Sequence, residues 1–410
     1  MSETVELKRS VSLLQLTLYG LGTTVGAGIY ALTGVVAGRA GLYAPVSFAL
    51  AAALAGVTAL SFAEMAARFP KSAGEAVYVR EGLGSNRLAL AVGLLVVGVG
   101  IISSAALLNG FVGYLQDFIT VPREVSLAVL AVVLFLIAGW GIGPSVTVAG
   151  VITVIEVGGL ILVIWAGSDG LADALPRWRD FVPGLGVGVW GGIFAGAIVA
   201  FYAFLGFEDM VNVAEEVRDA PRVLPLGIVL TLGVTLVLYV AVSLSAVAAL
   251  DPSALAASEA PLRLLFEHGS SLPPQLIGLI SLLAIINGAL VQVIMASRVL
   301  YGLVRQGALP GRLFAPLGRV HPWTRTPVVA TALAAALVLV LALGFRIAPL
   351  AETTSVITLV IFMTVNLALV RLKMKTPAPA GLFTLPFWLP VLGAGVSALV
   401  LMLEAVRLVA

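Results

Sequence analysis

The chain has 410 residues, of which 60% are apolar and only 11% are charged, and its formal net charge is +2. Soluble domains carry about 45–50% apolar and about 25% charged residues, so this chain has too few polar side chains to cover a globule in water. The composition excludes a soluble globular protein, collagen and a disordered chain, and it predicts a protein embedded in membrane lipids.

Cysteine is absent, and there are two histidines, His268 and His321. The lack of cysteine excludes disulfides, thiolate metal ligands and cysteine nucleophiles. Neither histidine falls in a predicted span, and the sequence contains no His-Glu-x-x-His or Gly-x-Ser-x-Gly pattern. We therefore predict no enzymatic activity, no catalytic residue, no metal or other cofactor and no nucleic-acid partner; an oligomeric partner is not indicated.

Eleven apolar runs can cross a bilayer, because a hydrocarbon core of about 30 Å needs about 20 residues of helix. In chain order they cover 13–38, 43–66, 88–115, 124–142, 145–167, 189–214, 223–250, 275–304, 327–345, 350–371 and 384–408. No long linker separates them, so residues 1–410 are predicted to form one all-α, polytopic transmembrane domain.

The positive charges predict the orientation of these spans. Sixteen Lys and Arg lie beside the spans on the side of the N-terminus, and seven lie on the opposite side. Because cytoplasmic loops are enriched in Lys and Arg, we expect a multi-pass protein of the cytoplasmic membrane with its N-terminus in the cytoplasm.

The first and sixth spans carry features that interrupt a membrane helix. Near mid-depth, the first contains TTVGAG at 23–28 and the sixth contains LGFED at 205–209. Glycine inside a helix costs about 1 kcal/mol relative to alanine, and a mid-membrane carboxylate costs about 2.5–3.5 kcal/mol on insertion scales. The alternative explanation, close packing of small residues between helices, accounts for the glycines but not for Glu208 and Asp209.

Two interruptions five helices apart predict a 5+5 inverted repeat with discontinuous helices 1 and 6 and a binding site at the midplane. The first repeat would cover about 11–167, the second about 189–372, and an additional helix about 384–408. The half-helix that begins near Gly28 would direct backbone amides at the break, and the half-helix that ends near Leu205 would direct carbonyls at it. Opposed helix ends of this kind suit a zwitterion, which favours an α-amino acid.

Four segments resemble the amino acid–polyamine–organocation (APC) superfamily of transporters, nearest its cationic-amino-acid-transporter-like and prokaryotic amino acid permease branches. They are TVGAGIY at 24–30, AEMAARFP at 63–70 with VYVRE at 77–81, FYAFLGFE at 201–208 with AEEV at 214–217, and ASRVLY at 296–301 with GALP at 307–310. Departures from the family pattern are Ala73 where glycine is usual and Asp219-Ala220 where Asn-Pro is common.

The resemblance implies a LeuT-like fold, alternating access to a central site, and a permease without cofactors. It implies that the substrate carboxylate lies on backbone amides around the first break and that the amine lies on carbonyls of the sixth. It also implies an aromatic side chain that closes over the substrate, for which Phe207 and Tyr202 are the candidates; packing against lipid or core is the alternative. The substrate-binding residues expected on this basis are Thr24, Gly26, Ala27, Gly28, Tyr202, Ala203 and Leu205.

Glu156 stands about halfway along the fifth span, where many bacterial members of the family have a lysine. A buried carboxylate tends to be protonated, so we expect Glu156 to carry a proton; a sodium ion, a second amine or a purely structural hydrogen bond are the alternatives. Sodium is less favoured, because span eight has no hydroxyl between Ser281 and Ser297. Glu208 is the second candidate for proton coupling, and capping of the half-helix that follows is its alternative.

Three carboxylates near the cytoplasmic ends of spans, Glu64, Glu215 and Glu216, are expected to pair with Arg68, Arg218 or Arg222. Small residues crowd both breaks and favour small or medium neutral amino acids, moved by proton symport. The alternatives are a cationic amino acid or polyamine transporter or exchanger, and a transporter-like amino acid sensor without net transport.

Overall fold

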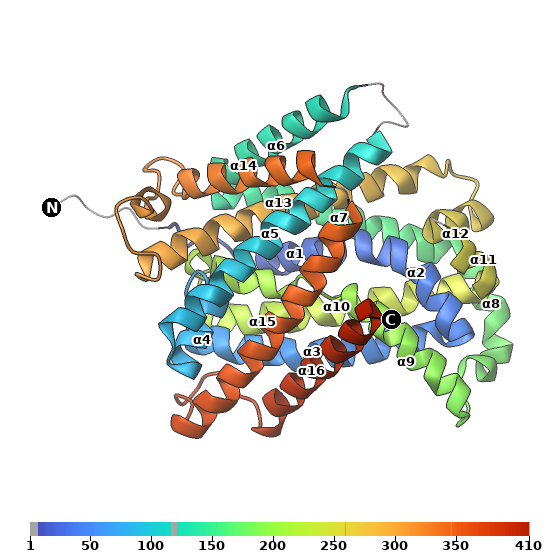
Figure 1. The fold of residues 1–410 in the computed structure, drawn as a ribbon. Helices are drawn as coiled ribbons and strands as arrows, with labels where there is room; N and C mark the ends of the chain where they lie inside the picture. Colours follow the sequence, from blue (N-terminus) through green and yellow to red (C-terminus); the bar gives the residue numbers. More distant parts are fainter. Residues whose placement is uncertain (1–6, 116–120, 259, 346, 410) are drawn as a thin grey trace.

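A computed structural model describes residues 7–115, 121–258, 260–345 and 347–409. Within these ranges the chain is helical apart from loops and one isolated parallel bridge between Val11 and Val217 (Figure 1). The helices pack side by side into one bundle, which confirms the all-α class predicted from the composition.

The first five predicted spans coincide with helices. They are α1 (Leu13–Thr24) with α2 (Ala27–Ala40), α3 (Ala44–Arg68), α5 (Asn86–Leu115), α6 (Arg123–Trp140) and α7 (Ile142–Ala166). The first span is interrupted as predicted, because α1 ends at Thr24 and a new helix begins at Ala27 after Gly26.

The remaining spans also coincide with helices, and the sixth is interrupted as predicted. They are α9 (Val187–Tyr202) with the 3₁₀ helix η3 (Phe207–Glu216), α10 (Ala220–Ala249), α13 (Gln275–Arg305), α14 (Val328–Gly344), α15 (Ile347–Lys375) and α16 (Trp388–Val409). The start of α16 lies beyond the predicted residue 384, because Pro386 disfavours helical backbone at the residue before it.

Short helices lie at the two ends of the bundle. They are η1 (Gly41–Tyr43), α4 (Gly74–Leu83), α8 (Ser168–Ala174), η2 (Leu175–Phe181), α11 (Pro252–Ala257), α12 (Pro261–Gly269) and η4 (Ala315–Gly318). In Figure 1, α4 lies at one end, and α8, α11 and α12 lie at the other. The long helices between them run through the apolar part of the molecule.

The outer surface is suited to lipid. Eight helical segments of the described residues are long and apolar enough to cross a membrane, and Val328–Gly344 and Trp388–Leu403 are shorter apolar helices. Large apolar side chains point outward from the bundle, with Leu136, Val237 and Val340 each 60–67% exposed. Water would make such exposure unfavourable, so the chain is a multi-span membrane protein.

Helices at corresponding positions of the two predicted repeats pack against each other. α2 packs on α9, α3 on α10, α5 on α13 and α6 on α14, and the members of each pair are five spans apart. Two repeats related by a pseudo-two-fold axis produce this pairing. The exact boundaries of the repeats stay a prediction.

Gly206 allows the two interrupted spans to touch. Its φ of +123° is a conformation that L side chains rarely adopt, and a Cβ on this residue would lie 2.9 Å from the Cβ of Thr23. Glycine is therefore required here both for its backbone conformation and for its lack of a side chain.

We expect Gly206→Ala to lower the melting temperature of the detergent-solubilised protein by several degrees, because backbone strain of about 1–3 kcal/mol adds to the clash with Thr23. Gly233→Ala is the control, since Gly233 lies inside α10 and a Cβ there would meet no atom within 4 Å. Equal melting temperatures for the two variants would contradict the assignment.

Candidate functional site

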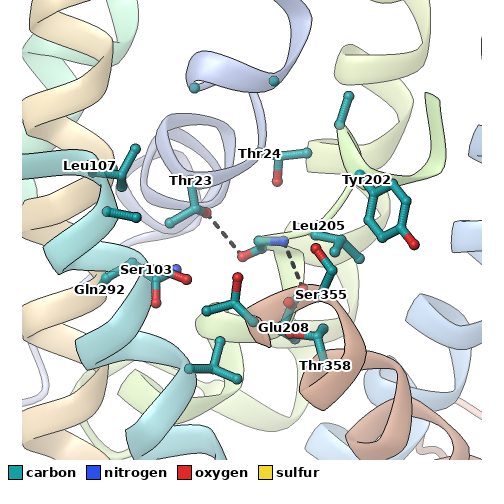
Figure 2. Close-up of a pocket in the computed structure, with 18 residues that line it drawn as sticks. Thr23, Thr24, Ser103, Leu107, Tyr202, Leu205, Glu208, Gln292, Ser355 and Thr358 are labelled. Carbon is teal, nitrogen blue, oxygen red and sulfur yellow. Dashed lines mark hydrogen bonds between the residues drawn. The ribbon is translucent and has the colours of Figure 1, made fainter. Parts of the chain in front are cut away.

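A cavity of about 270 Å³ lies between the two interrupted spans. Its walls come from the breaks and from α5, α13 and α15 (Figure 2). The lining residues are Thr23, Thr24, Gly26, Gly28, Val99, Ser103, Ala106, Leu107, Tyr202, Ala203, Leu205, Gly206, Glu208, Gly288, Gln292, Thr354, Ser355 and Thr358. Six of the seven predicted substrate-binding residues are among them, and the seventh, Ala27, is the first residue of α2.

The amino end of α2 faces this cavity. Gly26 is its N-cap residue, with φ −50° and ψ −150°, and no side chain among the described residues caps the helix. The first amides of a helix have no intrahelical partner, and the helix dipole places partial positive charge there. Because Gly26 and Gly28 line the cavity, a carboxylate in the cavity would meet these amides.

The carboxyl end of α9 faces the same cavity. After Tyr202 the chain forms a tight turn, in which the amides of Phe204 and Leu205 donate to the carbonyls of Phe201 and Tyr202 at 3.0 and 3.4 Å. A carbonyl oxygen has two lone pairs, so those at the end of α9 can accept a further hydrogen bond. An ammonium group in the cavity would complement the negative end of this helix.

Tyr239 of α10 links the two breaks and was not predicted. Its buried hydroxyl lies 2.6 Å from the carbonyl oxygen of Thr24 and 3.0 Å from that of Ala203. The ring packs edge-on against Phe204 and Phe48, with centroid distances of 5.0 and 5.7 Å. The sequence shows a lone tyrosine in the apolar seventh span. Because a buried tyrosine hydroxyl usually has a hydrogen-bond partner, this residue could have been selected as a candidate.

Further contacts hold the breaks together. The hydroxyl of Thr23 donates to the carbonyl of Gly206 at 3.0 Å, as Figure 2 shows. A Cβ on Gly28 would lie 3.1 Å from the Cα of Ala203. The two gaps are therefore in direct contact, and the opposed helix ends lie on one cavity.

The position of Glu208 is compatible with both roles considered from the sequence, helix capping and proton coupling. Its carboxylate accepts a hydrogen bond from the Gly206 amide at 2.8 Å, which caps η3, and its side chain also lines the cavity. It is the one charged side chain among the described lining residues. The neighbouring Asp209 accepts a hydrogen bond from Gln292 at 2.7 Å.

The two candidate gating aromatics lie in different surroundings. Tyr202 lines the cavity. Phe207 is fully buried beside it, with its ring 5.8 Å from Phe62 and 5.4 Å from Phe362, and does not belong to the lining. A gating role is still a prediction for both residues, and in this conformation Tyr202 is the one in position for it.

Glu156 belongs to a buried polar cluster outside the cavity lining. Asn287 donates to Glu156 and to Thr153, each at 3.0 Å. The second carboxylate oxygen of Glu156, the amide oxygen of Asn287 and the hydroxyl of Tyr30 have no hydrogen-bond partner among the described residues. α1 passes beside this cluster, because a Cβ on Gly22 would lie 2.6 Å from the Asn287 amide nitrogen.

Ion pairs and backbone contacts join the helices at the end of the bundle where α4 lies. Glu64 pairs with Arg68 as expected and also with Lys373. Glu216 does not pair with Arg218 or Arg222, because Arg298 of α13 reaches it inside the protein at 3.3 Å. The amides of Ser10 and Val11 donate to the Glu216 carbonyl, so the segment before α1 is attached to the end of η3.

α4 is attached to η3 at the same end. Asn212 accepts a hydrogen bond from the Gly74 amide at 3.0 Å and donates to Glu75 at 3.1 Å. Burial raises the pKa of Glu75 to about 8. The two family departures, Ala73 and Asp219, both have positive φ, of 56° and 46°, which explains why glycine and asparagine are usual there.

The model of the amino acid permease family matches residues 11–409. This chain belongs to the amino acid permease family. The family and the matching relatives are transporters, so the chain is not an enzyme. The curated relatives include the branched-chain amino acid permease BcaP of Bacillus subtilis, 27% identical over 90% of this chain and 82% of the relative. The methylthioribose transporter of the same species is 28% identical over 96% of this chain and 88% of the relative.

A vacuolar cationic amino acid transporter of Arabidopsis thaliana is 30% identical over 91% of this permease and 61% of the plant protein. Among solved structures, a substrate-bound, outward-open Na⁺-coupled sialic acid symporter matches with a TM-score of 0.61 and 12% identity, over 96% of this chain and 89% of that chain. A manganese transporter of Eremococcus coleocola matches with a TM-score of 0.59 and 14% identity, over 96% and 86%. At this identity the likeness shows the fold alone, which is the predicted LeuT-like fold.

Tyr239→Phe should weaken the binding of amino acids to the purified permease about 2- to 10-fold, because a hydrogen bond contributes about 0.5–1.5 kcal/mol and this one sets the distance between the breaks. Binding is measured as ligand-dependent thermal stabilisation. Tyr43→Phe, at the turn before α3, is the matched control. Unchanged affinity in Tyr239→Phe would show that the hydroxyl does not shape the site.

Proposed function

We propose that this permease is a secondary active transporter that moves small or medium neutral amino acids across the cytoplasmic membrane by alternating access. The opposed ends of α2 and α9 on one cavity are the observation that carries this proposal. They offer amides to the carboxylate and carbonyls to the ammonium group of the same molecule. Every α-amino acid has these two groups.

The size and chemistry of the cavity support a neutral substrate. Its volume of about 270 Å³ lies just below the range of about 300–1,000 Å³ found for the pockets of drug-sized ligands. Much of the wall consists of glycine, alanine, serine and threonine, with Leu107, Leu205 and Val99 as apolar contacts. The likeness to a branched-chain amino acid permease is consistent with a short aliphatic side chain.

A cationic amino acid or polyamine is the second candidate, and Glu208 favours it. This carboxylate lies on the cavity, and the plant relative is named as a cationic amino acid transporter. Against it, the Gly206 amide already donates to Glu208. The neutral substrate is therefore preferred.

Uptake of labelled leucine into proteoliposomes, with competition by unlabelled amino acids, tests the substrate class. Alanine, serine, leucine and isoleucine should compete, and lysine, arginine and putrescine should not. Uptake of labelled lysine or putrescine without uptake of labelled leucine would overturn the preference in favour of the second candidate. Binding of neutral amino acids without any uptake would instead indicate a sensor.

Proton coupling through Glu156 is the proposed source of energy. Glu156 is fully buried between α7 and α13, next to the interrupted first span, and among the described residues no cation pairs with it. A buried carboxylate without a cationic partner favours the protonated form. Movement of α1 during alternating access would change its exposure to water and release the proton.

Glu156→Gln should preserve exchange of labelled substrate but reduce accumulation driven by a pH gradient at least 10-fold, because glutamine keeps the shape and the hydrogen bonds without a titrating proton. Glu81→Gln, at the exposed end of α4, should accumulate substrate as the wild type does. Gradient-driven accumulation that survives in Glu156→Gln would falsify the coupling role. A dependence on a sodium gradient would assign the coupling to sodium.

The proposed orientation places the end with α4 in the cytoplasm. Arg80 belongs to α4, and Arg68 and Lys373, which both pair with Glu64, lie in the last turns of α3 and α15. The positive-inside rule assigns the end with these cations to the cytoplasm. The ion pairs and backbone contacts of this end would then close the cytoplasmic side of the cavity.

A further inference from the structure

A second cavity lies away from the central one, where three helices meet at the end of the bundle. Its volume is about 420 Å³. Arg68, the last residue of α3, and Lys373, in the last turn of α15, line it together with the loop 376–387 that leads to α16. Figure 1 shows the connection between α15 and α16 at the periphery of the bundle.

The cationic groups of this cavity are buried and only partly neutralised. The side chains of Arg68 and Lys373 are 4% and 11% exposed, and both contact one carboxylate, that of Glu64. Lys373 also donates to the Leu385 carbonyl at 2.6 Å, and the Leu385 amide donates to Glu64 at 2.8 Å. Two positive charges therefore share one negative charge, which leaves a net charge of +1.

One donor of the cluster is unused. The Nε atom of Arg68 is buried and has no hydrogen-bond partner among the described residues. A buried donor without a partner costs about 1–3 kcal/mol, and a guanidinium group recognises phosphate well because its donors form a planar fork. The excess charge and the unused donor both call for an anion with oxygen atoms.

The surroundings indicate that the anion belongs to a lipid. Phe387 lines the cavity and Trp388 begins α16, and these two rings are 50% and 61% exposed. Tryptophan is enriched at the headgroup level of a bilayer, which places Trp388 there. The outer face of α16 begins with Val391 and Leu392, each 46% exposed, and continues with Leu399 and Met402, which are 53% and 60% exposed. Acyl chains therefore have an apolar surface that starts beside the cavity and follows α16.

We propose that this cavity binds the phosphate of an anionic phospholipid between Arg68 and Lys373, with the acyl chains lying along α16. In the proposed orientation the lipid comes from the cytoplasmic leaflet, where anionic headgroups attract basic residues. The bound phosphate neutralises the excess charge and joins the end of α3 to the ends of α15 and α16.

Lipid-dependent thermal stability tests this site in the full-length, detergent-solubilised protein. Dioleoyl-phosphatidylglycerol should raise the melting temperature at micromolar concentration, whereas dioleoyl-phosphatidylcholine and inorganic phosphate at equal concentration should not. Equal stabilisation by the two lipids would overturn the recognition of an anion. If inorganic phosphate stabilises the protein as much as phosphatidylglycerol does, the proposal that the anion belongs to a lipid is overturned.

Charge variants locate the site. Lys373→Gln should bind phosphatidylglycerol about fivefold more weakly. One basic residue near the membrane surface adds a binding free energy that corresponds to about this change in affinity. Lys375→Gln removes the same charge two residues away, outside the cavity lining, and should bind as the wild type does. Lys373→Arg should retain binding.

Equal weakening in Lys373→Gln and Lys375→Gln would show a general surface-charge effect and overturn the site. Native mass spectrometry supplies a second measurement, as the fraction of protein that retains one phosphatidylglycerol molecule. The comparison of lipids with the wild type needs no variant, so it can overturn the proposal even if Lys373→Gln does not fold.

Discussion

Direct contact between the two interrupted spans organises the whole transporter. An interrupted helix in a membrane leaves amides and carbonyls that water cannot reach, and such groups are tolerated only around protein or a cavity. Here they are held together by Tyr239, whose single hydroxyl proton lies between a carbonyl oxygen of each break, and by Thr23, which donates to the carbonyl of Gly206. The same contacts leave the amino end of α2 and the carboxyl end of α9 on one cavity.

The surrounding helices make this contact possible. α3, α5, α10 and α13 pack as corresponding pairs around the interrupted spans. Of these helices, α5 and α13 supply the remaining cavity walls together with α15. Because the site is built from backbone and small side chains, its recognition of an amino acid does not require a charged residue. This leaves Glu208 and Glu156 available for other roles, such as helix capping, which is observed for Glu208, and proton coupling, which is proposed for Glu156.

Two groups of buried carboxylates can be distinguished, those with and those without a cationic partner. Around Glu156 several buried polar atoms have no hydrogen-bond partner among the described residues. The carboxylate accepts a hydrogen bond from Asn287, and no described cation pairs with it. At the end of the bundle with α4, Glu216 has Arg298 and Glu64 has two cations. A carboxylate with a cationic partner fixes the helices it joins, whereas one without such a partner can exchange a proton.

Local signals in the sequence were enough to predict the all-helical membrane fold, the positions of the long helices and the two breaks, because apolar runs, interior glycines and mid-membrane carboxylates can each be recognised within a short segment. The backbone residues of the cavity followed, since opposed helix ends are a consequence of the breaks. Which side chains meet across distant spans emerged only from the packed helices. These contacts depend on how the helices rotate and pack, and a single sequence carries no local signal for that. Examples are the contact of Tyr239 with both breaks, the pairs Arg298–Glu216 and Asn287–Glu156, and the position of Phe207 beside the cavity and not in its lining.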